Sequence, residues 1–434
     1  MMAGAGHSAA PVNLGEIERL IRAGETSDAR DRCLAAIDAG HNDARLWLLL
    51  AACQQRLTQS DEARTALRQA AEMTSQPALL EQIADAMLKV RDYRHASEAI
   101  ERLDFSRAHA VLLQARCRWG LGQHERAINQ LDALARILPD WPALALSHAR
   151  MLINLGRHRQ ALNRLDTALA AHRQAHSLAH QKALLLLTLE GAESAVEWLR
   201  TSQPLPASLQ AFADALRIVA GHETTVTQHA GPQWEGFTAL LDEPGEPGWF
   251  GDNVALLKHA LAHAPASGAL VECGVYQGRT VTLLGQWAAG RMIHGFDSFQ
   301  GLPQAWSALE PAGSYSTGGR LPSVPDNVEL VPGWFAETLP EFAAAQQAPV
   351  ALVHVDCDLY QSTCEVLSAL GPLLGPGSIV VFDEYTGYPG WRAHEFRAWQ
   401  EYLTARSIEA RLIGGQLLGQ SAAFQITATE GPNR

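Results

Sequence analysis

The sequence predicts a helical repeat domain followed by an α/β domain that is built on a mostly parallel sheet. Two observations carry this prediction: alanines recur at a nearly constant interval in the first half, and short apolar runs alternate with helical segments in the second. A third observation predicts a site, because three carboxylates, Asp356, Asp383 and Glu384, directly follow two of the apolar runs. At 434 residues, the chain is long enough for each domain to bury its own core.

The first half contains a repeat whose second helix carries an alanine near its start. Glycines five residues before three of these alanines, Gly24, Gly122 and Gly156, support the same register. This pattern resembles the tetratricopeptide repeat over residues 14–215, in which helical hairpins stack into a solenoid with a concave face. The marking alanines are Ala29, Ala63, Ala96, Ala127, Ala161 and Ala195, at separations of 34, 33, 31, 34 and 34 residues.

The repeat resemblance implies a protein-binding groove, and an arm for dimerisation or spacing remains the alternative. One helical hairpin cannot bury its apolar face alone, so we expect six stacked units to share a continuous core. Four tryptophans at helical spacing are expected in that core rather than in the groove: Trp47, Trp119, Trp141 and Trp198.

The segment 216–244 breaks the helical pattern with Gly, Pro and short polar runs, which predicts a linker between the two domains. The α/β domain should span residues 245–434. A terminal hairpin within 410–427 suggests an antiparallel edge to the sheet. The expected parallel strands are 269–275, 291–297, 328–334, 350–356 and 378–384.

A glycine turn after the first expected strand predicts a nucleoside-containing cofactor. Glu272, Gly274 and Gly278 lie in VECGVYQGRT, and Asp297 ends the next strand, where a carboxylate commonly accepts hydrogen bonds from ribose hydroxyls. The glycines alone fit a dinucleotide or S-adenosylmethionine. Tyr276 stands where the dinucleotide fingerprint has its second glycine, which disfavours a pyrophosphate against this turn.

The three carboxylates predict a small divalent cation at the carboxyl edge of the sheet. Asp356 follows one strand, and Asp383 and Glu384 follow the next, so neighbouring parallel strands would bring them together. Carboxylate oxygens are hard ligands, which favours Mg²⁺ over zinc.

Charge and cysteine content limit the classes of partner. The net charge is −12, and residues 240–434 hold 9 Lys or Arg against 20 Asp or Glu, which argues against nucleic acid or an anionic membrane. Six cysteines without CxxC spacing indicate neither a zinc site nor a disulfide framework. The first 20 residues do not resemble a signal peptide and the apolar runs are too short to span a bilayer, so we expect a soluble, cytoplasmic protein.

Five motifs in the second half occur in one order: VECGVYQGRT, GFDSFQGLP, VELVPGWFAETLP, HVDCDLYQST and VVFDEY. Together they resemble the macrocin-type O-methyltransferase family over about residues 245–428. The resemblance implies a class I methyltransferase sheet, Rossmann-like and with seven strands. It also implies Mg²⁺-dependent methyl transfer from S-adenosylmethionine to a sugar hydroxyl, as in natural product biosynthesis.

The same resemblance implies roles for particular residues. Asp356, Asp383 and Glu384 would hold the metal, and Asp356 would also be the general base. This chain has Asp-Glu where the family often has Asp-Asp, and the longer side chain still offers a carboxylate. The residues implied for the cofactor pocket are Glu272, Gly274, Tyr276, Gly278, Thr280, Asp297 and Ser298.

Other polar residues near these motifs have structural interpretations beside functional ones. Asp358 is expected to cap the following helix, and His294 and His354 are expected to be buried and hydrogen-bonded. His394 is expected either to contact substrate or to lie on a solvated helix. The long connection 303–327 predicts a lid over the substrate, with Trp306 and Tyr315 as stacking residues.

Three functions remain open at this stage. The first is the sugar or natural-product O-methyltransferase, with a small-molecule or glycan substrate, a protein partner or homo-oligomer formed through the repeats, and neither nucleic acid nor membrane as a partner. The second is a silent adaptor that binds S-adenosylmethionine without catalysis. The third is a methyltransferase for a phenolic, catechol-like substrate, which would use similar metal ligands.

Overall fold

The computed structural model of the chain describes residues 13–202, 206–222, 228–307 and 310–429. The other residues lie outside the described part of the chain. They belong to the N-terminal segment and to the predicted repeat domain, linker, lid and C-terminal domain: 1–12, 203–205, 223–227, 308–309 and 430–434. Contacts divide the chain into two compact units, one of Met1–Leu138 with Ala305–Pro311 and one of Pro139–Gln304 with Ala312–Arg434.

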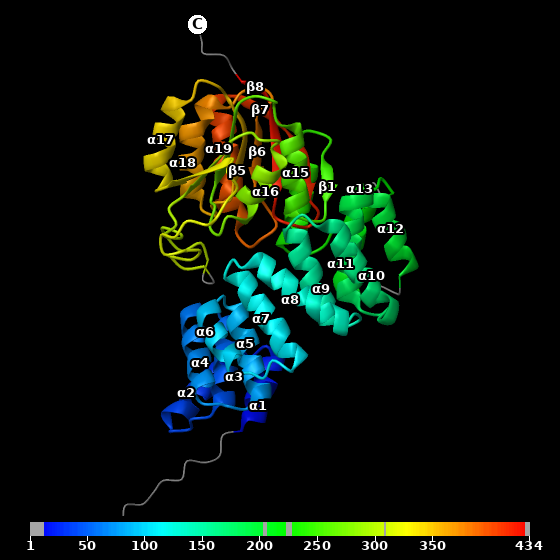
Figure 1. Ribbon diagram of the computed structural model, residues 1–434, viewed down its shortest axis with the longest axis vertical. Helices are drawn as coiled ribbons and strands as arrows, with labels where there is room; N and C mark the ends of the chain where they lie inside the picture. Colours follow the sequence, from blue (N-terminus) through cyan, green and yellow to red (C-terminus); the bar gives the residue numbers. More distant parts are fainter. Residues whose placement is uncertain (1–12, 203–205, 223–227, 308–309, 430–434) are drawn as a thin grey trace, which may run out of the picture. The chain divides into compact units, whose positions relative to one another are not determined.

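Six helical hairpins form the first half of the described chain (Figure 1). Every marking alanine lies on the second helix of its hairpin and is 0% exposed, which confirms the predicted repeat. The absence of a larger side chain there lets the paired helices approach closely. The hairpins are α1(Leu14–Ala23) with α2(Thr26–Asp38), α3(Ala44–Arg56) with α4(Ser60–Glu72), α5(Pro77–Lys89) with α6(Tyr93–Glu101), α7(Ala108–Gly120) with α8(His124–Ile137), α9(Pro142–Asn154) with α10(His158–Ala171), and α11(His176–Glu190) with α12(Ala192–Thr201).

The turns inside the first five hairpins share one backbone feature, a left-handed residue five positions before the marking alanine. Gly24, Gly122 and Gly156 have φ angles of 83°, 76° and 69°. In the second and third hairpins the same position holds Thr58 and Arg91, whose φ angles are 60° and 57°. The turn geometry is therefore kept where the glycine signal is missing from the sequence, at some cost in backbone strain.

The two compact units divide the repeat hairpins between them. The first four hairpins lie in the unit that ends at Leu138, whereas α9–α12 group with the sheet. Trp47 and Trp198 pack partly buried against separate apolar clusters, one in each unit. The segment predicted as a linker begins inside α13(Gln210–Val219), which follows η1(Ala207–Leu209), and includes α14(Pro232–Leu241).

The sheet has the strand order β1-β7-β8-β6-β5-β2-β3-β4. Within the described residues, β8 runs antiparallel to its neighbours β6 and β7, and every other pair is parallel. Seven strands match the predicted class I methyltransferase arrangement, and β1 adds an eighth. The strands are β1(Gly248–Phe250), β2(Ala269–Cys273), β3(Ile293–Asp297), β4(Val328–Pro332), β5(Val350–Val355), β6(Ile379–Phe382), β7(Ile408–Gln416) and β8(Ala422–Thr429).

The expected terminal hairpin is present as β7 and β8, but its predicted place at the edge of the sheet is wrong. β8 lies between β6 and β7, and β1 pairs with the outer side of β7 from Gly248↔Gly414 to Phe250↔Gln416. The three-residue β1 was missed because its sequence, GWF, is too short to show alternation.

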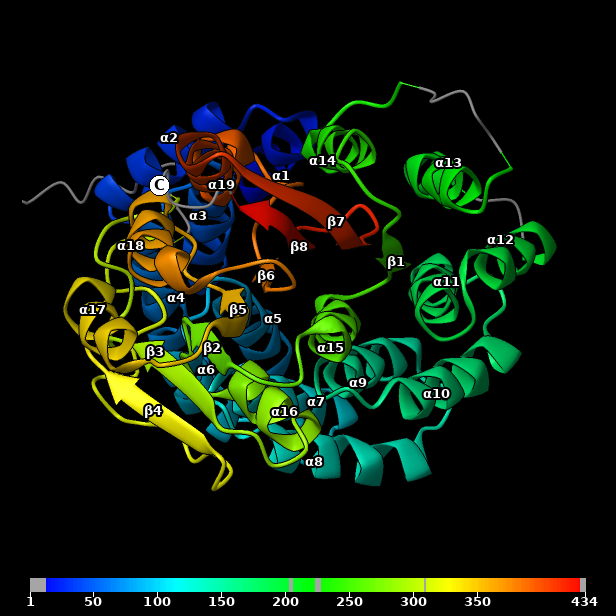
Figure 2. The same cartoon turned by 90° about the horizontal axis from the view of Figure 1, so that it is seen from above.

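Helices cover both faces of the sheet (Figure 2). The apolar residues of the strands alternate between the two resulting cores: Leu270 and Leu352 pack toward α15 and α16, and Val271 and Val353 pack on the opposite side. One face carries α15(Asn253–His263) and α16(Arg279–Trp287); the other carries α17(Phe335–Ala345), α18(Tyr360–Leu370) and α19(Glu395–Arg406), with η2(Gly371–Leu373) and η3(Trp391–Ala393) before α19.

Among the described residues, the structure contains no helix with both the length and the apolar character that a bilayer crossing requires.

Candidate active site

The carboxyl ends of three neighbouring strands bring the predicted site residues together. β5 lies between β2 and β6, with Cys273 opposite Val355 and Val355 opposite Phe382. Beyond these pairs, the Asp356 amide donates to the Cys273 carbonyl at 2.8 Å, and the Asp383 amide donates to the Val355 carbonyl at 2.9 Å. The strand ends are therefore fixed by backbone hydrogen bonds just where the carboxylates begin.

Three carboxylates form a cluster at this edge: Asp356, Asp358 and Glu384. One oxygen from each side chain lies within 4.8 Å of the others. The prediction that Asp358 caps the next helix is wrong, because the N-cap of α18 is Leu359 and no side chain caps it. Asp358 instead has a left-handed φ of 61° and is 7% exposed. We call Asp356, Asp358 and Glu384 the carboxylate cluster.

The electrostatics of the carboxylate cluster suit a bound cation. Burial and the charge of Asp383 raise the pKa of Asp356 well above its usual value, and burial with the same charge raises the pKa of Glu384. Within the described residues, Oε2 of Glu384 is buried without a hydrogen-bond partner. A divalent cation would balance these negative charges and satisfy that oxygen, so the residues present fit Mg²⁺.

Glu395 is a fourth buried carboxylate that the sequence analysis missed. It is the first residue of α19, is 0% exposed, and accepts the Glu384 amide at 3.0 Å through Oε2. Burial and the charge of Asp358 raise the pKa of Glu395 well above its usual value. Nothing in the local sequence AHEF signals this role, since a lone Glu at the start of a helix is ordinary.

The Asp383 side chain accepts hydrogen bonds from residues outside the carboxylate cluster. Its Oδ1 accepts hydrogen bonds from Asn253 Nδ2 at 2.8 Å and Ser421 Oγ at 3.3 Å, and Nε2 of His354 lies 3.9 Å away. Burial opposes its ionisation, but His354 and Asn253 lower the pKa of Asp383 to about 2. Asp383 is thus a charged neighbour of the carboxylate cluster, and Asn253 is a residue that sequence analysis did not single out.

His354 is buried and hydrogen-bonded, as predicted. Its Nδ1 lies 2.9 Å from Oε2 of Glu272, and Oε1 of Glu272 accepts a hydrogen bond from Thr280 at 2.9 Å. Burial disfavours the imidazolium, yet Asp383 and Glu272 raise the pKa of His354 to about 10. Glu272 is 0% exposed, and its hydrogen bond with Thr280 supports the predicted cofactor turn by tying β2 to α16 on either side of it. The partly buried His294 pairs with Glu329 at 3.0 Å.

The predicted cofactor turn connects β2 to α16. Gly274 and Gly278 have φ angles of 100° and 79°, and Gly278 is the N-cap of α16. A Cβ on Gly274 would lie 1.7 Å from the Asp356 carbonyl oxygen, so only glycine allows the ends of β2 and β5 to meet this closely.

Asp297 ties the cofactor turn to the end of β3. Oδ2 accepts the amides of Val275 and Tyr276 at 2.8 and 2.7 Å, and Oδ1 accepts the Phe299 amide at 2.6 Å. The side chain remains partly exposed. Ser298 follows it, and its hydroxyl accepts the Gln300 amide at 3.1 Å. Hydrogen bonds thus join two pairs of the seven residues expected at the cofactor, Glu272 with Thr280 and Asp297 with Tyr276.

The expected lid contacts the cofactor turn through an aromatic pair. Tyr315 lies edge-to-face with Tyr276, with ring centroids 5.5 Å apart. Trp306 belongs to the stretch that groups with the first compact unit. His394 is the N-cap of α19 and is partly buried, with its ring 6.0 Å from that of Tyr388.

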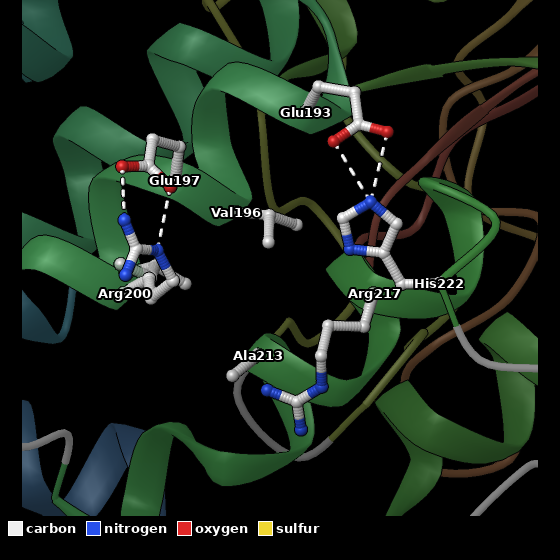
Figure 3. Close-up of a pocket in the computed structure, with 8 residues that line it drawn as sticks. Glu193, Val196, Glu197, Arg200, Ala213, Arg217 and His222 are labelled. Carbon is white, nitrogen blue, oxygen red and sulfur yellow. Dashed lines mark hydrogen bonds and ion pairs between the residues drawn. The ribbon is translucent and has the colours of Figure 1, made fainter.

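A separate cavity of about 340 Å³ lies between α12 and α13 (Figure 3). Its charged lining residues pair with carboxylates: His222 with Glu193 at 3.0 Å, and Arg200 with Glu197 at 2.7 Å. None of the residues that line it belongs to the predicted site.

Comparisons with known proteins identify a methyltransferase domain in the second half of the chain. Residues 271–385 match a family described as a methyltransferase domain. The 8-demethyl-8-(2,3-dimethoxy-alpha-L-rhamnosyl)-tetracenomycin-C 4'-O-methyltransferase of Streptomyces olivaceus is 29% identical over 157 residues, 31% of this chain and 59% of that protein. The mycinamicin III 3''-O-methyltransferase of Micromonospora griseorubida is 28% identical over 171 residues, 32% of this chain and 66% of that protein.

A third relative is the demethyldecarbamoylnovobiocin O-methyltransferase of Streptomyces niveus, 29% identical over 156 residues, 30% of this chain and 58% of that protein. The chain spans about three fifths of the length of the relatives it matches. The second half of the chain thus contains a methyltransferase domain related to these O-methyltransferases, which confirms the resemblance carried by the five motifs.

Solved structures give weaker matches. The calicheamicin methyltransferase structure is 24% identical with a TM-score of 0.31, covering 55% of this chain and 93% of that one. A tetratricopeptide repeat protein from Parabacteroides merdae is 14% identical with a TM-score of 0.38, covering 45% and 79% of the two chains. The fold assignment given above rests on the strand order and on the repeat hairpins themselves.

Proposed function

We propose that the protein is a Mg²⁺-dependent O-methyltransferase that transfers a methyl group from S-adenosylmethionine to a hydroxyl of a sugar or glycosylated natural product. The observation that carries the proposal is the carboxylate cluster at the ends of β5 and β6, directly beside the glycine turn at the end of β2. A donor site and an acceptor site on adjacent strands are what methyl transfer between two bound molecules requires. The three related proteins are sugar or natural-product O-methyltransferases by name.

Different residues of the chain would bind the methyl donor, hold the metal and accept the proton. The turn from Gly274 to Gly278, with Asp297 and Ser298, would hold the methionine and ribose parts of the donor. Asp356, Asp358 and Glu384 would hold the metal, and the Asp383 carboxylate, predicted from the sequence as a ligand, would lie beside them. When bound, S-adenosylmethionine supplies an activated methyl group and Mg²⁺ supplies a Lewis acid for the acceptor oxygen. Asp356 would accept the hydroxyl proton, a contribution of ~10²–10⁴ in rate.

A phenolic substrate is the alternative within the enzyme class, because the same ligands would orient the two oxygens of a catechol. The rhamnosyl group in the name of one relative favours a sugar. The buried charges argue against a silent adaptor, since a scaffold gains nothing from carboxylates whose pKa values are raised by burial and mutual repulsion.

The repeats would supply a surface for a protein partner or for a second copy of the chain. Large apolar side chains remain exposed on the first unit, including Ile137 at 75% and Leu121 at 42%. All six cysteines are free thiols, which supports a reducing, cytoplasmic location.

The test is methyl transfer from labelled S-adenosylmethionine to a panel of glycosylated metabolites and catechols, with and without chelator. We expect product with sugar acceptors, loss of product with chelator, and loss with Asp356→Asn. Product that survives both the chelator and the substitution would contradict the mechanism. Binding of S-adenosylhomocysteine without turnover on any acceptor would favour the adaptor.

A further inference from the structure

The last two repeat hairpins contact the methyltransferase sheet within one compact unit, and these contacts meet at residue 252. Figures 1 and 2 show α11 beside β1, and contacts between these two elements agree with this view. A Cβ on Gly251, just after β1, would lie 2.2 Å from the Leu184 carbonyl oxygen of α11. The backbone of the repeat thus approaches the start of α15 as closely as glycine permits.

Asp252 is the junction between the repeat hairpins and α15. Both of its carboxylate oxygens lie 3.1 Å from Nε2 of His158, the first residue of α10. The Thr188 hydroxyl of α11 donates to Oδ2 at 3.3 Å and also accepts the Gly251 amide at 2.9 Å. On the sheet side, Asp252 caps α15 by accepting the Ala255 amide at 2.9 Å. Asp252 is 9% exposed, so these partners replace most of its water.

The next residue continues toward the candidate active site. Asn253 donates from Nδ2 to Oδ1 of Asp383 at 2.8 Å, and Asp383 adjoins Glu384 of the carboxylate cluster. The turn between α9 and α10, which precedes His158, contacts the helix after the cofactor turn. Arg279 of α16 donates to the Asn154 carbonyl at 3.4 Å. Gly156 of this turn lies against Trp287, where a Cβ would be 3.2 Å from the ring.

We propose that His158 and Thr188 of the repeat hairpins are positioning residues for the methyltransferase site. They hold Asp252, Asp252 fixes the first turn of α15, and Asn253 on that turn fixes the Asp383 carboxylate beside the metal ligands. The hairpins α9–α12 are then part of the catalytic domain rather than a separable binding arm. This inference rests on the proposed function for the metal, and on contacts alone for the positioning.

A purely structural contact would stabilise the fold and leave metal binding unchanged. A positioning role also predicts weaker metal binding, because the removal of residues that orient metal ligands commonly lowers metal affinity by ~10–100-fold. His158→Ala deletes the imidazole, and Thr188→Val deletes one hydroxyl while keeping the side-chain shape. His158→Gln keeps a donor that can reach Asp252. His222→Ala is the matched control, because His222 pairs with Glu193 at 3.0 Å elsewhere in the same unit.

The experiment uses the full chain, with MgCl₂ titrated by calorimetry and amide hydrogen exchange measured without metal. We expect His158→Ala to weaken Mg²⁺ binding about tenfold, Thr188→Val to weaken it less, and His158→Gln and His222→Ala to leave it within about twofold. Exchange of the Ala255 and Asp383 amides should accelerate in His158→Ala and not in His222→Ala.

Unchanged Mg²⁺ affinity in folded His158→Ala and Thr188→Val overturns the positioning role, whatever the loss of stability. If His158→Ala does not fold, Thr188→Val decides. If the wild-type chain binds no Mg²⁺, the metal part of the proposed function fails. The exchange of the Asp383 amide then decides the positioning role by itself.

Discussion

Nδ1 of His354 on β5 lies 2.9 Å from Oε2 of Glu272 on the neighbouring β2, and both side chains are almost completely buried. The other ring nitrogen is 3.9 Å from Oδ1 of Asp383. One imidazolium therefore lies between the carboxylate that supports the cofactor turn and the carboxylate beside the metal ligands. The two halves of the candidate site share a single buried cation.

His354→Leu should destabilise the fold by about 3–5 kcal/mol, because it leaves the buried Glu272 and the partly buried Asp383 without their cation. Urea denaturation at neutral pH measures this loss. The matched control is His294→Leu on β3, whose partner Glu329 is 61% exposed, and we expect little change there.

The effect of His354→Leu should depend on pH. The folded-state pKa of about 10 is raised above the ordinary value of 6.5, so this contribution is complete below about pH 6.5 and disappears as the pH rises through 10. The difference between wild type and His354→Leu should shrink across that window. A difference that stays constant from pH 6.5 to 10 would show that His354 acts by packing alone.

Ala127→Leu should destabilise the first compact unit by about 1–3 kcal/mol, because Ala127 is 0% exposed where the helices of its hairpin meet. Ala133→Leu on the same helix is the control: Ala133 is exposed, and we expect a change within about 0.5 kcal/mol. Hydrogen exchange of the α8 amides reports on this unit separately from the sheet. Equal effects of the two substitutions would mean that the alanine period does not mark close helix contacts.

Much of the fold could be predicted because its signals are periodic. The marking alanines located the second helix of every hairpin, and the apolar runs located β2 to β6, although not the parallel β1. The division after Leu138 could not be predicted, since the repeat pattern continues unbroken across it. The hairpins α9–α12 group with the sheet and contact it through residues far apart in the sequence, such as His158 and Asp252, which are separated by 94 positions.

The sequence predicted the site residues that directly follow strands. It did not predict those that lie at the starts of helices. Asp356 and Glu384 lie directly after apolar runs, so their meeting followed from parallel pairing. Asp358 was assigned to a cap because Asp before a helix usually caps it, but the left-handed φ of 61° places it in the carboxylate cluster. Glu395 and Asn253 stand at helix starts, and only the fold brings them to the strand ends.

Tyr315→Ala should weaken binding of S-adenosylhomocysteine about 3–10-fold, because an aromatic pair contributes ~0.5–1.5 kcal/mol beyond its buried area. Tyr315 packs edge-to-face on Tyr276 of the predicted cofactor turn, and its removal takes away this ring contact. Tyr315→Phe keeps the ring and should bind as the wild type does. Calorimetric titration provides the affinities. An unchanged affinity in Tyr315→Ala would separate the lid from the cofactor turn.

Gly274→Ala should cost about 3–5 kcal/mol of folding stability, which is among the largest effects of a single substitution. Its φ is 100°, and the added Cβ would meet the Asp356 carbonyl oxygen at 1.7 Å, with no flexible side chain to move aside. β2 and β5 would have to separate where the Asp356 amide bonds to Cys273, so the carboxylate cluster would move from the cofactor turn. Gly290→Ala is the control, with a φ of 84° and no atom within 4 Å of the added Cβ, so only backbone strain of ~1–2 kcal/mol is expected. Urea denaturation of both variants tests this, and equal losses would show that the close approach of the two strand ends contributes nothing beyond the glycine backbone.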